Sequence, residues 1–508
     1  MRLKKTALCA TVALGLALAS CTGGSSGGST QAQKNITLGN VLAPATFAAQ
    51  NANWGNQSVY FQAVYDSLLK IAPNGHDVQP SLATSWSYNA DKTVLTMKLR
   101  SGVKFTDGTL FTAAVAAQNL MRFKNGTSPQ KSKISDLVSA TAPDATTLVI
   151  TLKKANPAFL IYLGQAAGLE ESPAEAGKPD AQTNPVGSGP YTLNKGKTVV
   201  GTSYVFDKNP NYWDAKDVHY NTLTVNVYTD PTSELNALRG KQLNAATVAD
   251  PTIVPQVQGA GFTMNGQNLN FAGLLLFDRS GKTNPALGDV TVRQAINYAI
   301  DGSAMLKTVA QGKGVPTGQV FPESSPAYDA SLNSVYPYNP TKAKQLLAEA
   351  GYSSGLTLTI PTSPGFSPSL WPLLQQQLQN VGISVKFVDT GQNIISDLQG
   401  QKYGLSYFTL QRDANDWMLI STMIAPDATW NTFKYQDPKV NSLLETIRTS
   451  TGDAQDAALK KLNEYVVQQA WFDPWYAPTL YFATDGRTSV TLNEGNAWPN
   501  LWDITPKA

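Results

Sequence analysis

A regular alternation of helices and strands in the second half of the chain is the feature that most limits its fold. Helix, strand, helix and strand patterns follow one another over residues 339–352, 355–360, 368–382 and 383–389. Asn339 and Pro340 suit the N-cap and first turn of the first helix, and Gly351 ends it. An alternation of this kind is typical of an α/β lobe, so we expect an α/β fold.

The length of the chain requires more than one such lobe. It has 508 residues, whereas a single hydrophobic core stops growing at about 250–300 residues, so two or three domains are expected. Strand-like runs also occur in the first half, at 93–105, 145–153 and 223–229. Together these runs favour mixed sheets flanked by helices.

The N-terminus has the pattern of an export signal. Basic residues precede an apolar run at 6–19 that is too short to span a bilayer. Residues 18–21, Leu-Ala-Ser-Cys, resemble the lipobox of bacterial lipoproteins. This resemblance implies a signal peptide over 1–20 and lipid on Cys21, followed by a flexible linker, so that the linker segment is 21–35. We expect an exported protein anchored by lipid to the extracytoplasmic face of the cell membrane, in a periplasm or on the outer surface.

Charge and cysteine content exclude several classes of function. Removing the three basic residues of the signal from the 39 in the chain leaves 36, equal to the 36 acidic residues. A neutral balance argues against a nucleic-acid groove, which needs a basic surplus. The two cysteines are Cys9, lost with the signal, and Cys21. No thiol is left for a disulfide, a zinc site or a nucleophile, so stability has to come from the core.

The chain shows few patterns of catalytic chemistry. Its two histidines, His76 and His219, stand in turn-like stretches where a surface loop position is expected. The Gly-Lys-Thr triplets at 196–198 and 281–283 lack the upstream glycine of a phosphate-binding loop. Residues 128–131 have the Ser-x-x-Lys spacing of penicillin-recognising enzymes, but no Lys-Thr-Gly motif accompanies it. We therefore expect no enzyme, no cofactor and no metal site.

Six motifs carry a resemblance to a known family. They occur in order at 79–123, 184–193, 206–214, 289–301, 338–352 and 373–387. With them the chain resembles the extracytoplasmic solute-binding proteins of ABC importers, in the peptide-binding branch (family 5), which has oligopeptide-, dipeptide- and nickel-binding members. The resemblance implies a two-lobed α/β fold of the periplasmic-binding-protein type II, with mixed sheets, flanking helices and an extra subdomain on the first lobe. It also implies a monomer that closes its lobes on a ligand and serves the permease and ATPase subunits of an importer.

The same resemblance divides the chain into discontinuous segments. It implies a first lobe over 36–57, 184–285 and 477–508, an extra subdomain over 58–183, and a second lobe over 286–476. These boundaries follow turns in the sequence. The ligand is expected between the two lobes.

The stretch 410–417, LQRDANDW, takes the place of the family motif W-x-x-D-Y-x-(D/E)-P. In that motif the first acid receives the α-ammonium group of a peptide, so the resemblance assigns this role to Asp413 and the second acid to Asp416. A carboxylate that faces an ammonium in a cleft forms a charge-assisted hydrogen bond of about 1.5–3 kcal/mol. The alternative is that Asp413 caps a helix or pairs with Arg412 on a loop.

The other candidates for ligand contact are Trp417, Tyr407 and Arg412. The two aromatic rings either stack on a ligand or lie in the core. The chain departs from the motif at Leu410, Ala414 and Trp417, and its 10 Trp, 20 Tyr and many amides suit a sugar. An oligopeptide is therefore the first expectation and an oligosaccharide the second, while nickel, haem or hydrolase chemistry come last.

Overall fold

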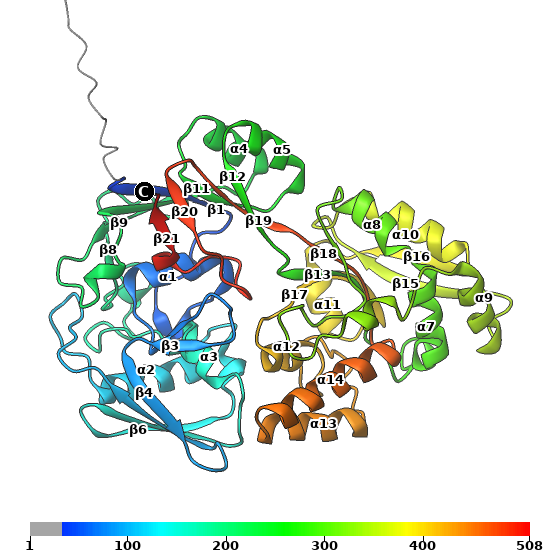
Figure 1. The fold of residues 1–508 in the computed structure, drawn as a ribbon, viewed down its shortest axis with the longest axis horizontal. Coiled ribbons are helices and arrows are strands. Elements are labelled where there is room, and N and C mark those ends of the chain that lie inside the picture. The colour runs from blue at the N-terminus through cyan, green and yellow to red at the C-terminus, as the bar shows by residue number, and fades with distance from the viewer. Residues whose placement is uncertain (1–32, 508) are drawn as a thin grey trace, which may run out of the picture. The chain divides into compact units, whose positions relative to one another are not determined.

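The sheet of the first lobe takes strands from the start, the middle and the end of the chain (Figure 1). The computed structural model describes residues 33–507; the predicted signal peptide, Cys21 and the linker up to residue 32 lie outside this range. The seven strands are ordered β12 (Thr263–Gln267), β19 (Leu480–Thr484), β11 (Ala245–Val248), β1 (Asn35–Asn40), β10 (Thr222–Val227), β9 (Ser203–Lys208) and β8 (Tyr191–Leu193). β1 runs parallel to β10 and β11 and the other pairs are antiparallel, so the sheet is mixed, as predicted.

Helices cover this sheet and complete the first lobe. The further elements of this lobe are α4 (Pro231–Arg239), α5 (Val254–Gly259), β20 (Thr488–Val490) and β21 (Ile504–Pro506). Helix α1 (Ser58–Val64), at the start of the segment predicted as the subdomain, contacts β8. α4 and α5 share a small core with the sheet, in which Leu238 and Val257 pack with Ala246 and Ala483. Burial of these apolar side chains fixes the two helices on the sheet.

An antiparallel sheet forms the body of the segment predicted as the extra subdomain. Its order is β4 (Ala83–Tyr88), β5 (Val94–Leu99), β7 (Thr147–Leu152) and β6 (Leu137–Asp144), and the segment also contains β2 (Leu69–Ile71), β3 (Val78–Pro80), α2 (Ala113–Asn125) and α3 (Phe159–Leu163). α2 packs on β6 and β7. The hydroxyl of Thr112 accepts a hydrogen bond from the Val115 amide, so Thr112 is the N-cap of α2.

The second lobe contains the helix and strand alternation predicted from the sequence. Its strands are the antiparallel set β14 (Gly314–Pro316), β18 (Phe472–Pro478), β13 (Asn270–Leu276) and β17 (Leu405–Gln411), and the parallel pair β15 (Leu356–Thr362) and β16 (Ile383–Asp389). Its helices are α6 (Pro285–Gly288), α7 (Val290–Ala299), α8 (Gly302–Val309), α9 (Pro340–Glu349), α10 (Leu370–Gln379), α11 (Ile394–Gln399), α12 (Asp416–Met423), α13 (Pro438–Thr449) and α14 (Asp453–Gln468). Asn339 Oδ1 accepts a hydrogen bond from the Lys342 amide at 2.9 Å, so the predicted N-cap is confirmed.

Two neighbouring chain segments connect the lobes. β12 and β13 are consecutive in the chain but belong to different sheets, and so do β18 and β19. The two segments pair with each other in both sheets. Gln267 pairs with Leu480 in the sheet of the first lobe, and Ala272 pairs with Tyr476 in the sheet of the second lobe. The first change of sheet falls inside the segment 184–285 that we assigned to the first lobe, and the segment boundaries remain a prediction.

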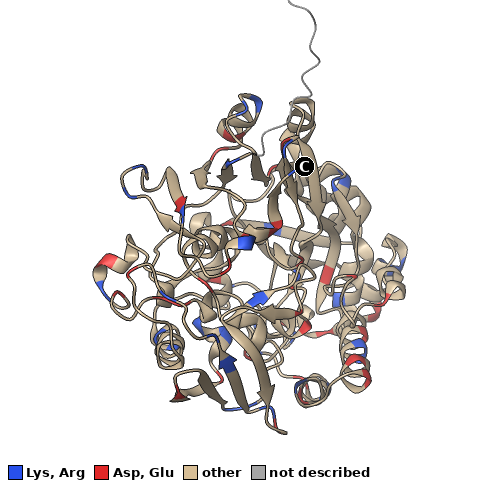
Figure 2. Ribbon diagram, turned by 60° about the vertical axis from the view of Figure 1, so that its left-hand side comes forward, with Lys and Arg blue, Asp and Glu red and all other residues tan. Residues whose placement is uncertain are grey.

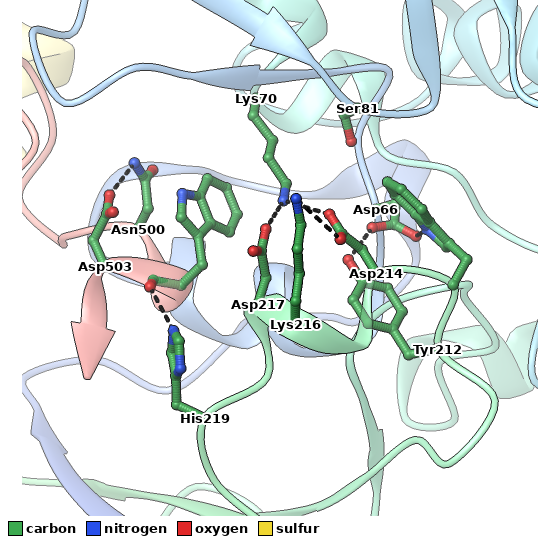
Figure 3. Close-up of polar contacts among 12 residues, drawn as sticks. Asp66, Lys70, Ser81, Tyr212, Asp214, Lys216, Asp217, His219, Asn500 and Asp503 are labelled. Carbon is green, nitrogen blue, oxygen red and sulfur yellow. Dashed lines mark hydrogen bonds and ion pairs between the residues drawn. The ribbon is translucent and has the colours of Figure 1, made fainter. Parts of the chain in front are cut away.

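A buried polar cluster fixes β2 to the first lobe (Figure 3). Lys70 Nζ lies 2.5 Å from Asp217 Oδ2 and 3.4 Å from Asp214 Oδ2, and it lies 4.7 Å from the centroid of the Trp502 ring. His219 Nε2 lies 3.1 Å from the Trp502 carbonyl oxygen. His219 lies in a loop, as predicted, where it is half-buried and has this one structural contact.

Candidate ligand-binding cleft

A cavity of about 230 Å³ is lined by the subdomain, the first lobe and the second lobe together. The short turn Lys131–Ile134 contributes from the subdomain, and the end of β17 and helix α12 contribute from the second lobe. Its wall includes Trp54, Gln130, Lys133, Asp413, Met418 and Trp430. This cavity lies between the lobes, where the family resemblance implies that a ligand binds.

Asp413 is the buried acid of this cavity, with 8% of its surface exposed. Gln411 Nε2 donates a hydrogen bond to Asp413 Oδ1 at 2.9 Å and a second one to the Gly495 carbonyl at 2.6 Å. Burial raises the pKa of Asp413 to about 6, against the lowering effect of the Lys133 charge and the Gln411 hydrogen bond. No cationic nitrogen of residues 33–507 lies within 4.0 Å of this carboxylate.

The helix-cap alternative for Asp413 is excluded by the geometry of α12. The N-cap of this helix is Asn415, whose Oδ1 accepts a hydrogen bond from the Met418 amide at 3.2 Å. Asp413 lies two residues before the cap and lines the cavity instead. Its carboxylate is therefore free to meet a ligand.

Lys133 is the second charged group of the cavity, and no motif in the sequence pointed to it. The residue is half-buried, and its Nζ lies 5.5 Å from the centroid of the Tyr162 ring. Burial lowers the pKa of Lys133, while the negative charge of Asp413 raises it. No carboxylate oxygen in the part of the chain that the structure describes lies within 4.0 Å of Nζ. Its stretch of sequence showed only turn residues.

Two tryptophans form the apolar part of the wall. Trp54 is buried, whereas Trp430 is half-buried, with its ring centroid 4.6 Å from that of Phe408 and 6.4 Å from that of Phe277. Met418 of α12 adds a thioether side chain, which adapts to ligands of different shape. The cavity thus combines apolar surfaces with one acid and one base.

Arg412 lines a different pocket, of about 280 Å³, beside the connection between the lobes. Its Nη2 donates a hydrogen bond to the Asn268 carbonyl at 3.0 Å, and burial lowers the pKa of Arg412 to about 10. Asn268 lies between β12 and β13. Arg412 therefore does not pair with Asp413, its neighbour in the sequence, but attaches the second lobe to the connecting segment.

Asp416 and Trp417 lie at a third pocket, of about 240 Å³, on the other end of the loop that carries Asp413. Asp416 accepts a hydrogen bond from the Ser325 hydroxyl, and burial raises the pKa of Asp416 to about 6. Trp417 is buried, with the Arg448 guanidinium 5.0 Å from its ring centroid. For both residues a ligand contact stays a prediction.

Tyr407 lies in the core of the second lobe. Its ring stacks on that of Trp475, with centroids 5.5 Å apart and planes inclined by 24°. The packing supports the core alternative that the sequence left open for this residue. Of the five residues predicted to bind a ligand, the structure brings Asp413 to the wall of the cavity between the lobes.

Three small residues meet beside Asp413. A Cβ atom at Gly75, in the β2–β3 turn, would lie 1.9 Å from the Glu494 carbonyl oxygen and 2.7 Å from the Ala414 Cβ, and Gly75 has a φ of +74°. A Cβ atom at Gly495 would lie 2.9 Å from the Ala414 amide nitrogen. Both positions therefore require glycine. Because the three segments come from the subdomain, the second lobe and the first lobe, this contact closes one side of the site.

Basic and acidic residues are interspersed along the ribbon (Figure 2). Among residues 33–507, none of the helices has both the length and the apolar character needed to cross a membrane. In the same range, no three His, Cys, Asp or Glu side chains gather so that they could hold a metal ion. The charged residues of the cavity wall are Asp413 and Lys133.

Comparison with known proteins identifies the family. Residues 77–442 match the family described as bacterial extracellular solute-binding proteins, family 5 middle. The chain is 31% identical over 415 residues to the glutathione-binding protein GsiB of Escherichia coli strain K12, which covers 78% of this chain and 79% of that protein. It is 30% identical over 433 residues to GsiB of Pectobacterium atrosepticum, with 80% of each chain covered.

Solved structures share the two-lobed α/β fold. NikA from Brucella suis in complex with Fe(III)-EDTA superposes with a TM-score of 0.80 at 23% identity, over 93% of this chain and 100% of that one. DppA from Helicobacter pylori in complex with the peptide STSA gives 0.79 at 21% identity, over 94% and 99%. The chain therefore belongs to family 5 of the bacterial extracellular solute-binding proteins, the non-enzymatic substrate-binding components of ABC importers.

Proposed function

We propose that this protein is the lipid-anchored substrate-binding subunit of an importer for oligopeptides, which it holds between its lobes and delivers to a membrane permease. The observation that carries the proposal is the Asp413 carboxylate, which is buried at the cavity and has no cation within 4.0 Å among residues 33–507. The named ligand of GsiB and the peptide bound to DppA support the peptide class.

A peptide α-ammonium group supplies the partner that Asp413 lacks. An unpaired charge in a water-poor cavity is unfavourable, and a charge-assisted hydrogen bond contributes about 1.5–3 kcal/mol. Gln411 orients the carboxylate, because its amide also donates to the Gly495 carbonyl. A ligand that contacts Asp413 and the opposite wall stabilises the closed form by its greater affinity for that form.

The proposal is tested by replacing the acid and by blocking the ammonium group. We expect Asp413→Asn in the full-length protein to weaken binding of free-amine peptides by about 10- to 150-fold. N-acetylation of the peptide should weaken its binding to the wild-type protein by a similar factor. It should weaken binding to the variant only slightly further. Isothermal titration calorimetry with Ala-Ala to penta-alanine and with glutathione measures these values.

Glu234→Gln is the matched control. Glu234 is also a buried acid, whose pKa burial raises to about 8, but it lies on α4 of the first lobe, away from the cavity. Its replacement should change peptide affinity by less than about threefold, which is within the usual effect of a remote substitution. Equal binding of free-amine and N-acetylated peptides by the wild-type protein would disprove the role of Asp413.

An oligosaccharide is the second candidate ligand. The side-chain amides of Gln130, Gln165 and Asn496 line the same cavity as Trp54 and Trp430. Aromatic faces and amide groups are what a sugar site needs. Sugars that raise the melting temperature, together with peptides that never do, would decide for this candidate.

The lipid anchor rests on residues 18–21, which lie outside the described residues. Metabolic labelling with a radioactive fatty acid should label the wild-type protein and not a Cys21→Ser variant. Label retained by the variant would show that lipid is not attached at this cysteine.

A further inference from the structure

The pocket beside the connection between the lobes has a buried cation in its wall. This cation is Arg412, which is 6% exposed; the other buried arginines of the described chain are Arg279 and Arg293. Arg293 donates hydrogen bonds to three carbonyl oxygens. Arg279 donates two, and its guanidinium lies 4.2 Å from the centroid of the Trp471 ring. The Arg412 guanidinium makes a single hydrogen bond within the described chain, so it is the least satisfied of the three.

No acid of the protein pairs directly with this guanidinium. Among residues 33–507, no carboxylate oxygen lies within 4.0 Å of an Arg412 side-chain nitrogen. The acids in the pocket wall are Glu323 and Glu494, and both are exposed. Burial lowers the pKa of Arg412 to about 10, against the opposing effect of the Glu323 charge, so the guanidinium is charged at neutral pH. A buried charge without a contacting counter-ion is unfavourable, and a bound anion would compensate it.

The Arg412 pocket is separate from the cavity that contains Asp413. The Arg412 amide donates a hydrogen bond to the Leu269 carbonyl at 2.8 Å, so the pairing of β17 with β13 continues through this residue. Side chains alternate between the two faces of a strand. Gln411 and Asp413 line the cavity, and Arg412 between them lines the pocket. The two walls have only Gly495 in common, so a ligand at one does not have to displace a ligand at the other.

Apolar side chains form another part of the pocket wall. They are Leu269, Val315, Pro316 and Pro322. Val315 belongs to β14 and is 38% exposed, although exposure of a large apolar side chain is unfavourable. The pocket volume of about 280 Å³ is just below the 300–1,000 Å³ typical of sites for drug-sized ligands, so the pocket suits a smaller molecule.

We propose that this pocket is a second binding site, for a short-chain monocarboxylate whose carboxylate pairs with Arg412 and whose apolar tail covers Val315. The planar guanidinium group matches the geometry of a carboxylate and forms charge-assisted hydrogen bonds with it. The exposed charges of Glu323 and Glu494 repel a second negative group, so they select against dicarboxylates. This site is additional to the peptide cavity and does not depend on the proposed function.

Ligand-observed NMR titration of the full-length protein tests the proposal with four small probes. They are butyrate, acetate, succinate and butylamine. We expect butyrate to bind most tightly. Acetate should bind by up to about 15-fold more weakly, because it lacks two CH₂ groups that each add about fourfold when buried. Succinate and butylamine should bind more weakly than butyrate, because one has a second negative charge and the other has no carboxylate.

Four variants locate the site. Arg412→Gln should weaken butyrate binding by at least tenfold. Glu323→Gln should strengthen it by about two- to fivefold, because a like charge leaves the wall. Glu445→Gln is the matched control, since this exposed acid lies on α13 outside the pocket, and it should change nothing. Val315→Ser should weaken butyrate binding and leave acetate nearly unchanged. Glu323 and Val315 are exposed, so their variants test the site even where Arg412→Gln does not fold.

The outcomes distinguish this inference from the peptide function. Asp413→Asn should bind butyrate with wild-type affinity, and loss of butyrate binding in this variant would place the carboxylate in the peptide cavity and overturn the inference. Absence of saturable butyrate binding, or equal affinity of wild type and Glu323→Gln, would overturn it too. Butylamine binding tighter than butyrate would show a cation site instead. None of these results changes the peptide affinities, which are measured separately with Asp413→Asn.

Discussion

At the scale of single residues, proton binding to Asp413 competes with ligand binding. Burial raises the pKa of Asp413 from 3.8 to about 6, and an ammonium group needs the ionised carboxylate. In the unfolded chain the Asp413 carboxyl ionises near pH 3.8. In the folded protein without a ligand it ionises near pH 6. The contribution of this group to the free energy of unfolding therefore falls as the pH rises from about 4 to 6 and is constant above.

The affinity for a free-amine peptide is accordingly expected to depend on pH. It should fall by up to tenfold per pH unit below about pH 6, be highest near pH 7, and be about twofold lower at pH 8, because the α-ammonium of the peptide loses its proton near pH 8. Calorimetric titrations at pH 5, 6, 7 and 8 measure this profile. The dependence should be lost in Asp413→Asn, and a wild-type affinity that is constant from pH 5 to 8 contradicts the assignment.

At the scale of elements, the β2–β3 turn, the loop after β17 and the C-terminal loop meet through small residues. Gly75→Ala places a methyl group 1.9 Å from the Glu494 carbonyl oxygen. Because of this clash we expect the three segments to stay apart on this side of the site, and we expect the affinity for the ligand to fall by at least tenfold. Gly102→Ala is the control, because Gly102 has a similar φ of +77° with no atom within 4 Å of the added Cβ. Calorimetry on both variants separates the clash from backbone strain; equal affinities would show that the contact does not matter for binding.

Local signals explain which elements and residues were predictable. The N-cap Asn339 was predicted correctly because a cap is encoded within four residues of its helix. Asp413 could be singled out because it stands in a continuous motif, and the structure brings it to the cavity wall; its contact with a ligand stays a prediction. Lys133 was not found, because its partner in the cavity is 280 positions away and a lysine in a turn looks like any surface lysine. Trp54 and Trp430 also line the cavity. Their place in its wall depends on contacts between distant parts of the chain, which no local pattern of the sequence shows.

At the scale of the whole molecule, the largest hydrophobic core continues from one lobe into the other. It contains Trp498 of the first lobe, Leu95 of the subdomain and Leu444 of the second lobe. Shared burial of this kind favours cooperative unfolding of the lobes.

Calorimetric melting is expected to show one main transition that a bound peptide moves as a whole. A ligand at 100 times its dissociation constant adds about 2.7 kcal/mol to the free energy of unfolding, which gives a clear rise in melting temperature. Because its affinity is expected to be about 10- to 150-fold weaker, Asp413→Asn should lose about half to nine-tenths of this added free energy at the same peptide concentration. Two transitions, with one of them insensitive to the peptide, would show that the lobes unfold independently.

The paired connections between the lobes have a further consequence for how such a protein can change over evolution. The chain leaves the first sheet after β12 and returns to it in β19, and these two strands are hydrogen-bonded neighbours. The ends of the segment between them are thus about one strand spacing, 4.8 Å, apart. The second lobe is an insertion whose first and last residues lie side by side, so it can be exchanged between relatives as one unit. Such an exchange replaces the Asp413 half of the site and retains the half that holds Lys133.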